Sequence, residues 1–316
     1  MYKRIIVTGG TSVVGYGLEG LAAKGEYPGR EFLFLGSKEC DLLDREAIRN
    51  LVAKWKPDAI LHFAAIAAGV QKNIEHPASM MRDNIFMNFN VAEAARSGGN
   101  PKVLMMLSPS IYPLQAPVPM KEESLHAGYP HESNYGYAFA KRLIDPMCKA
   151  YRKEYGLDMI GIIPGAIMGP RSSFNPSNST ALPALIRRFY EEREETGPLN
   201  VWGDGSPLRQ VTSDEDMARI SMWCLDNYND AQLLNVSTSE EISIKDAAYA
   251  IAECLKVDPK RIVFDTSKPT GTHSQALDNS KFMALADFKY APIRDTIKRT
   301  ADYFAANYPD PEKLRL

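Results

Sequence analysis

The sequence predicts an α/β protein in which helices cover both faces of a parallel sheet, followed by a smaller α/β region. Short apolar runs alternate with helix-like segments through the first half of the 316-residue chain. Apolar runs without polar alternation are typical of strands buried on both faces. After Pro164 this rhythm gives way to a loop rich in Pro, Gly, Ser and Asn. We therefore expect a first domain over 1–164 and a second region over 165–316, with some later segments returning to the first domain.

The elements follow from hydrophobic periodicity and turn residues. In the first domain the expected strands are 3–7, 32–35, 59–63, 103–107 and 159–163. The expected helices between and after them are 14–24, 44–55, 78–95 and 135–155. In the second region we expect helices over 181–194, 244–255 and 293–307, with strands over 199–202 and 262–264.

Composition excludes several classes of protein. A net charge of −2 gives no bulk attraction to nucleic acid or to an anionic membrane. No stretch approaches 18 consecutive apolar residues, so no membrane span is expected. The four cysteines are far apart and form no CxxC or Cys/His cluster, so neither a disulfide framework nor a metal site is expected. These features fit a cytoplasmic protein.

The stretch VTGGTSVVG lies between the first strand and the first helix. Glycines let the backbone approach a pyrophosphate, and the helix N-terminus offers amide donors, as in Rossmann-type dinucleotide sites. Ser12 stands in the middle of the turn, where its side chain either crowds the phosphate or bonds to it. The alternative is a tight turn without a ligand. The cofactor-binding residues expected here are Gly9, Gly10, Thr11, Ser12, Val13, Val14 and Gly15.

The end of the second strand reads Leu35-Gly36-Ser37-Lys38, with no acid to hold a ribose 2′-hydroxyl. A hydroxyl and a lysine suit a 2′-phosphate, so we expect NADP(H) rather than NAD(H), unless Lys38 is an ordinary surface lysine. Asp41 is a candidate partner for the adenine amino group. The other expected cofactor contacts are Leu42, Ala64, Ala65, Ile66, Leu107, Tyr137, Lys141, Pro164, Ala166 and Ile167.

The stretch SNYGYAFAKR places Tyr137 and Lys141 four residues apart, on one face of a helix. A nearby ammonium is expected to lower the pKa of the phenol, so that Tyr137 can act as an acid–base. Ser108, at the end of the fourth strand, would hydrogen-bond the substrate oxygen. The alternative is a solvent-facing Tyr/Lys pair; we favour the catalytic interpretation because of its position after the Gly-rich turn.

The chain resembles the GDP-L-fucose synthase family of extended short-chain dehydrogenase/reductases over essentially its whole length. The most specific stretches are SNYGYAFAKR, FNPSNSTALPALIRRF, VWGDGSPLRQ and FDTSKPTG. The resemblance implies that Ser108, Tyr137 and Lys141 are the reductase residues, that Arg188 and Arg209 contact the nucleotide diphosphate, and that Trp202 lies beside the base. The substrate-binding set it implies is Ser108, Ser110, Asn175, Thr180, Arg188, Trp202 and Arg209.

Two departures from this family are chemical. By the resemblance, a cysteine base and a histidine acid exchange protons at C3 and C5 of the sugar; here the two positions hold Ser110 and Thr180. A hydroxyl without an adjacent base cannot remove a carbon-bound proton near neutral pH. Ala166 also stands where the family has an asparagine, and His273-Ser274-Gln275 replaces a more basic stretch.

We therefore expect an NADPH-dependent C4 reductase of a GDP-linked 4-keto sugar, a 6-deoxyhexose or a heptose, without 3,5-epimerase activity. The alternatives are a bifunctional GDP-L-fucose synthase with other acid–base groups, an NAD-dependent nucleotide-sugar 4-epimerase, and a non-catalytic NADP sensor. The resemblance also implies a homodimer formed through the helices around 81–95 and 137–151.

Overall fold

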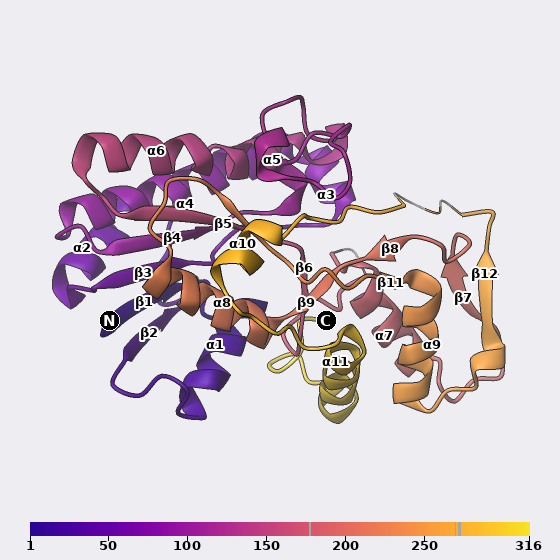
Figure 1. Cartoon of the computed structure of the whole chain (residues 1–316). Helices are drawn as coiled ribbons and strands as arrows, with labels where there is room; N and C mark the ends of the chain where they lie inside the picture. The colour runs from indigo at the N-terminus through magenta and orange to yellow at the C-terminus, as the bar shows by residue number, and fades with distance from the viewer. Residues whose placement is uncertain (177, 269, 271–272) are drawn as a thin grey trace.

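A parallel six-stranded sheet with helices on both faces forms the larger part of the chain, and a smaller α/β part lies beside it (Figure 1). This computed structural model describes residues 1–176, 178–268, 270 and 273–316. The strand order is β10-β5-β4-β3-β1-β2. The strands are β1 (Arg4–Thr8), β2 (Glu31–Leu35), β3 (Ala59–His62), β4 (Lys102–Met106), β5 (Met159–Pro164) and β10 (Leu234–Val236).

Alternate side chains of the strands enter two separate cores, one on each face of the sheet. Ile6 and Ile60 belong to one core, whereas Ile5 and Leu61 belong to the other. All four side chains are fully buried, which explains the continuous apolar runs in the sequence. The doubly wound fold expected from the sequence is therefore confirmed.

The first face carries α2 (Arg45–Trp55), α4 (Pro77–Ser97), α5 (Tyr135–Arg142) and α6 (Ile144–Tyr155). One helix had been expected over 135–155, but the structure has two, joined at Leu143. Pro146 lies in the first turn of α6 and has no backbone N–H to donate to the preceding turn, which accounts for the break. A short helix, α3 (Val70–Glu75), precedes α4 and was also not predicted.

The opposite face carries α1 (Val13–Ala23), α8 (Asp214–Asn227) and α10 (Ser280–Leu285). Sequence periodicity missed α8 and β10, although Ser213 and the acids after it form a helix-start signal. The Ser213 hydroxyl accepts a hydrogen bond from the Asp216 backbone N–H at 3.0 Å. Gly17 lets α1 lie against α8, since a Cβ there would be 2.8 Å from the Asp214 carbonyl oxygen. These later segments pack on the first part, and the division at residue 164 stays a prediction.

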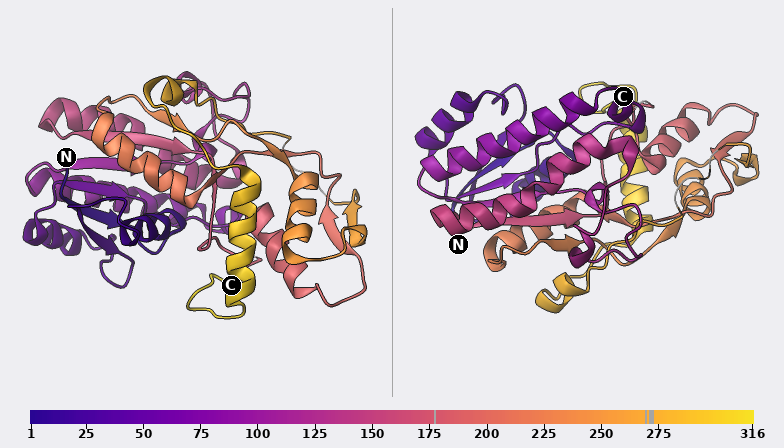
Figure 2. Two further views of the ribbon diagram at one scale, coloured as in Figure 1. Left: turned by 60° about the horizontal axis from the view of Figure 1, so that its bottom comes forward. Right: turned by 90° about the horizontal axis from the view of Figure 1, so that it is seen from above.

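The smaller part contains a third core between α7 (Ala181–Glu191), α9 (Ile244–Leu255) and α11 (Ile293–Asn307). Helix α7 is shorter than expected, ending at Glu191. Three strand pairs complete it: β6 (Ala166–Met168) with β9 (Val211–Ser213), β7 (Leu199–Trp202) with β12 (Ile262–Asp265), and β8 (Leu208–Arg209) with β11 (Ile242–Ser243). Figure 2 shows α11 standing between the sheet and the rest of this part. No helix in the described ranges is long and apolar enough to cross a membrane.

Candidate functional site

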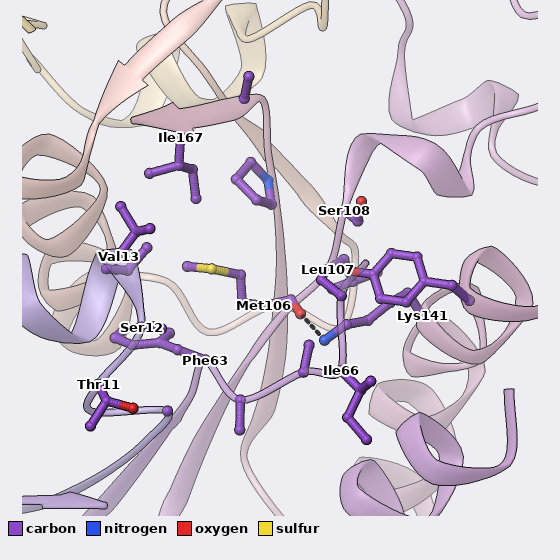
Figure 3. A pocket seen from close by; sticks show the side chains of 18 of the residues that line it. Thr11, Ser12, Val13, Phe63, Ile66, Met106, Leu107, Ser108, Lys141 and Ile167 are labelled. Atoms are coloured by element: carbon purple, nitrogen blue, oxygen red, sulfur yellow. Dashed lines mark hydrogen bonds between the residues drawn. The ribbon is translucent and has the colours of Figure 1, made fainter. Parts of the chain in front are cut away.

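A cavity of about 1000 Å³ opens at the carboxyl ends of β1 to β5, where the larger and smaller parts meet. Open parallel sheets bind their ligands at this edge. Figure 3 shows Thr11, Ser12 and Val13 on one side of the cavity and Ser108 and Lys141 on the other. The sequence-predicted cofactor turn and reductase residues therefore face a common space.

The Gly-rich turn is built for close backbone approach. Gly9 has φ +71°, and a Cβ there would lie 2.7 Å from the Ala64 nitrogen, so a side chain is strained and blocked at this position. Ser12 begins α1, and its hydroxyl accepts a hydrogen bond from the Gly15 N–H at 3.1 Å. The side chain that replaces a glycine thus caps the helix. With the α1 N-terminus on the cavity, the turn fits a dinucleotide pyrophosphate.

The end of β2 differs from the expectation in one respect. Ser37, Asp41 and Leu42 line the cavity, but Lys38 is exposed and does not line it. The Glu39 carboxylate accepts a hydrogen bond from the Gly36 N–H at 2.7 Å. An acid therefore does stand at the end of this strand; the sequence interpretation missed it because Glu39 folds back toward the strand.

The predicted reductase residues come from two elements. Ser108 follows β4, whereas Tyr137 and Lys141 lie one turn apart on α5, and all three line the cavity. The Lys141 ammonium is buried and donates a hydrogen bond to the Met106 carbonyl at 2.9 Å (Figure 3). This contact holds the cation at the end of β4.

Burial controls the protonation of this pair. It raises the pKa of Tyr137, while a hydrogen bond with Ser108 acts in the opposite direction. Burial also lowers the pKa of Lys141 to about 8. The expected net lowering of the phenol pKa is not found in this structure, because desolvation outweighs the effects that favour the phenolate of Tyr137. Tyr137 is thus a protonated phenol near neutral pH, the form that an acid in a reduction requires.

Most predicted cofactor residues line the cavity, and the exceptions have identifiable positions. The lining residues include Gly9, Thr11, Ser12, Val13, Val14, Ala64, Ala65, Ile66, Leu107, Pro164, Ala166 and Ile167. Gly10 and Gly15 do not line it; they shape the turn. A Cβ at Gly10 would lie 2.8 Å from that of Phe34, and one at Gly15 would meet the Gly9 carbonyl.

The structure separates the predicted substrate residues. Thr180 and Arg209 line the cavity with Ser108. The other predicted substrate residues do not line the cavity. Asn175 donates to the Leu316 carbonyl at 3.1 Å, Arg188 donates to the Asn200 carbonyl, and Trp202 is 62% exposed on β7. Their roles stay predictions. Two residues of the FDTSKPTG stretch, Pro269 and Gly271, lie outside the described residues.

The two positions expected to carry proton exchange hold hydroxyls. Ser110 does not line the cavity, and its hydroxyl oxygen lies 2.9 Å from that of Ser108. Thr180 is exposed at the start of α7, and its side chain does not cap the helix. None of the chain's five histidines is among the described lining residues. Cys40 is, but it sits with Asp41 beyond β2, and burial raises the pKa of its thiol.

Sequence reasoning missed several lining residues. Arg315 and Gln275, from segments far along the chain, reach the cavity wall, as do Ala181, Leu182 and Pro183 at the start of α7. Gln275 stands in a stretch that departs from the family pattern, but nothing in the sequence alone places Gln275 or Arg315 at the cavity. The described residues contain no group of three or more His, Cys, Asp or Glu side chains that could hold a metal ion.

Residues 5–237 match the NAD dependent epimerase/dehydratase family. The chain belongs to this family. It is 34% identical to a GDP-L-fucose synthase from Dictyostelium discoideum over 98% of both chains. The predicted resemblance to GDP-L-fucose synthases is thereby confirmed.

Solved structures agree with the fold. A GDP-L-fucose synthetase from Naegleria fowleri bound to NADP is 33% identical, with a TM-score of 0.92 over 99% of this chain and 95% of that one. A GDP-mannoheptose C4 reductase from Campylobacter jejuni with NADP bound has a TM-score of 0.84 over 96% and 98% of the two chains. At 22% identity, the second likeness concerns the fold alone.

Proposed function

We propose that this family member is an NADPH-dependent reductase of the C4 carbonyl of a GDP-linked 4-keto sugar, and that it performs no 3,5-epimerisation. The observation that carries the proposal is the composition of one cavity wall. Ser108, Tyr137 and Lys141 are together there, whereas the described lining contains no histidine and has Thr180 where the family acid is expected. The NADP-bound relative and the GDP-L-fucose synthase relatives support the choice of cofactor and of GDP-sugar.

The roles of the residues follow from their chemistry. When bound, the reduced cofactor supplies the hydride that C4 receives. The turn at Gly9 and the α1 N-terminus hold its pyrophosphate. Ser108 donates a hydrogen bond to the C4 oxygen, and Tyr137 gives that oxygen a proton. The Lys141 ammonium stabilises the phenolate left on Tyr137 through its charge.

The alternative is a bifunctional GDP-L-fucose synthase, favoured by the 34% identity over nearly the whole chain. It would need a new carbon acid–base near the sugar. Among the described lining residues, Cys40 and Asp41 lie beyond β2, Arg209 and Arg315 cannot lose their protons, and Tyr137 and Lys141 already have a role in reduction. We therefore rank this function second.

The test is an assay of several NDP-linked 4-keto sugars with NADPH, with products identified by NMR. A GDP-linked 4-keto sugar should be reduced at C4 with equal consumption of NADPH. Its configuration at C3 and C5 should be unchanged. Reduction of sugars on other bases in preference to GDP would overturn the choice of substrate, and absence of any NADPH consumption would overturn the reductase.

Cofactor preference gives the first prediction. NADPH is expected to give a higher kcat/KM than NADH, through Ser37 and Lys38. Lys38→Ala should weaken NADPH selectively, by up to about fivefold, because an exposed ion pair contributes up to about 1 kcal/mol. Glu39→Gln should instead strengthen NADPH relative to NADH, since it removes a carboxylate at the same end of β2. Steady-state kinetics with both cofactors check this, and equal or better kcat/KM with NADH would contradict it.

Assembly gives the second prediction. We expect a homodimer through α4, α5 and α6, where Phe86 is 51% exposed on α4. Phe86→Glu should shift the protein toward monomer, because it places a charge in an apolar contact. Leu285→Glu is the matched control: Leu285 is 53% exposed on α10, on the other face of the sheet. Light scattering at micromolar concentration checks both variants, and a monomeric wild type would refute the interface.

A further inference from the structure

The segment after α11, residues 308–316, turns back and is fixed against the loop that follows β6. The Phe174 N–H donates to the Arg315 carbonyl at 2.8 Å. Leu314 is 1% exposed in the core of the smaller part. The Arg171 guanidinium donates to two further carbonyls of the segment, at 2.7 and 2.8 Å. The backbone at Arg315 is therefore held in place by several independent contacts.

This anchoring brings Arg315 to the cavity. Arg315 lines it together with the Gly-rich turn, Tyr137 and Lys141. In Figure 1 the C mark lies beside α11 and β9, where the larger and smaller parts meet. Helix α11 contacts both β6 and β9, in agreement with this position. A cation from the far end of the described chain thus faces the space assigned above to two nucleotides.

The Arg315 side chain is open to an incoming anion, because this residue is exposed. Among the described residues, no carboxylate pairs with the Arg315 guanidinium, and no hydrogen bond satisfies it. Desolvation lowers the pKa of Arg315, and the nearby Arg171 cation acts in the same direction. The neighbouring Lys313, by contrast, has Asp310 at 3.6 Å. An exposed guanidinium that has no carboxylate partner and lies near a second cation attracts an incoming anion.

We infer that Arg315 binds a phosphate of a nucleotide in this cavity. The inference rests on the proposed function, which supplies two sources of the same chemistry: the cofactor pyrophosphate and the diphosphate of the sugar nucleotide. Guanidinium matches both, because its planar fork donates two parallel hydrogen bonds to phosphate oxygens. Arg315 is thus assigned as a ligand-binding residue that neither the Gly-rich turn nor the SNYGYAFAKR stretch contains.

The test compares wild type with Arg315→Met, Arg315→Lys and Lys313→Met by calorimetric titration with NADP+ and, separately, with GDP. Arg315→Met should weaken at least one nucleotide about 10- to 100-fold, the effect of losing a charge-assisted hydrogen bond. Arg315→Lys should recover part of that loss, because it restores the charge without the fork. Lys313→Met removes one charge from the same segment and should leave both affinities unchanged.

The two titrations identify the source of the phosphate. A loss confined to NADP+ assigns Arg315 to the cofactor, and a loss confined to GDP assigns it to the sugar nucleotide. Unchanged affinity for both nucleotides in Arg315→Met, with wild-type binding intact, overturns the inference and leaves the proposed function standing. Wild type that binds neither nucleotide overturns the proposed function itself. Thermal unfolding of each variant shows whether a loss of affinity comes from a loss of folding. If Arg315→Met is poorly folded, the nucleotide affinities of Arg315→Lys decide between these outcomes.

Discussion

Tyr137→Phe is expected to lower the rate of C4 reduction about 10²- to 10⁴-fold, the usual contribution of a positioned general acid. The substitution removes one hydroxyl and leaves the ring, so the cavity keeps its shape. Cofactor affinity should change little, because the substitution leaves intact the Gly-rich turn that would hold the pyrophosphate. NADPH consumption at saturating substrate and titration with NADP+ measure the two effects separately.

Tyr135→Phe is the matched control for this change. Tyr135 lies at the start of the same helix but is 43% exposed and does not line the cavity. It should keep wild-type turnover. Near-wild-type turnover in Tyr137→Phe would contradict the mechanism, because another group would then have to supply the proton.

Lys141→Met is expected to reduce both turnover and cofactor affinity, with turnover falling by about 10²- to 10³-fold. It removes the charge that stabilises the phenolate. It also removes the hydrogen-bond donor that the Lys141 ammonium presents from α5.

The charge of Lys141 also predicts the pH dependence of the wild type. Burial lowers the pKa of Lys141 from its ordinary value of 10.5 to about 8, so the active ammonium form is present below about pH 8 and is lost as the pH rises through that value. Wild-type kcat/KM should therefore fall above about pH 8.

A pH profile of kcat/KM reports the free enzyme and so tests this directly. Lys149→Met, which removes an exposed lysine paired with Asp145 on α6, should retain both turnover and the alkaline decline. In Lys141→Met the residual activity should lose that decline. A variant that keeps the wild-type profile would show that another group titrates there.

The central sheet could be predicted from the sequence because its strands are buried on both faces and have no polar alternation. The break at Leu143 could also have been predicted, since Pro146 stands inside the expected helix. Helix α8 was missed because buried acids interrupt its apolar pattern; Asp214 and Asp216 are both buried. Its helix-start signal at Ser213 was the better guide.

The site could be predicted where local sequence fixes local geometry. The turn at Gly9 and the Tyr137–Lys141 pair depend on residues close together in the chain, and both line the cavity. Lys38 and Glu39 were harder, because the direction of two adjacent surface side chains is not a property of the sequence pattern. Arg315 could not be predicted from the sequence, since only the folding of the segment after α11 brings it to the cavity wall.

The central claim is that this cavity reduces C4 without exchanging protons at C3 or C5. Ser110 and Thr180 have hydroxyls far too weakly acidic for carbon acid–base work, and among the described residues the Ser110 hydroxyl bonds to another hydroxyl, that of Ser108. Restoring a thiol and an imidazole with Ser110→Cys and Thr180→His is the constructive control. Exchange in that double variant would show that only these groups were missing; continued absence would implicate the sugar pocket, with Ala166 first.

The most direct measurement is incubation of the wild type with a GDP-linked 4-keto sugar and NADPH in D₂O, followed by NMR of the product. We predict a C4-reduced product with no deuterium at C3 or C5 beyond a control without enzyme. Deuterium at either carbon above that control would contradict the claim and make the bifunctional GDP-L-fucose synthase the better description of this chain.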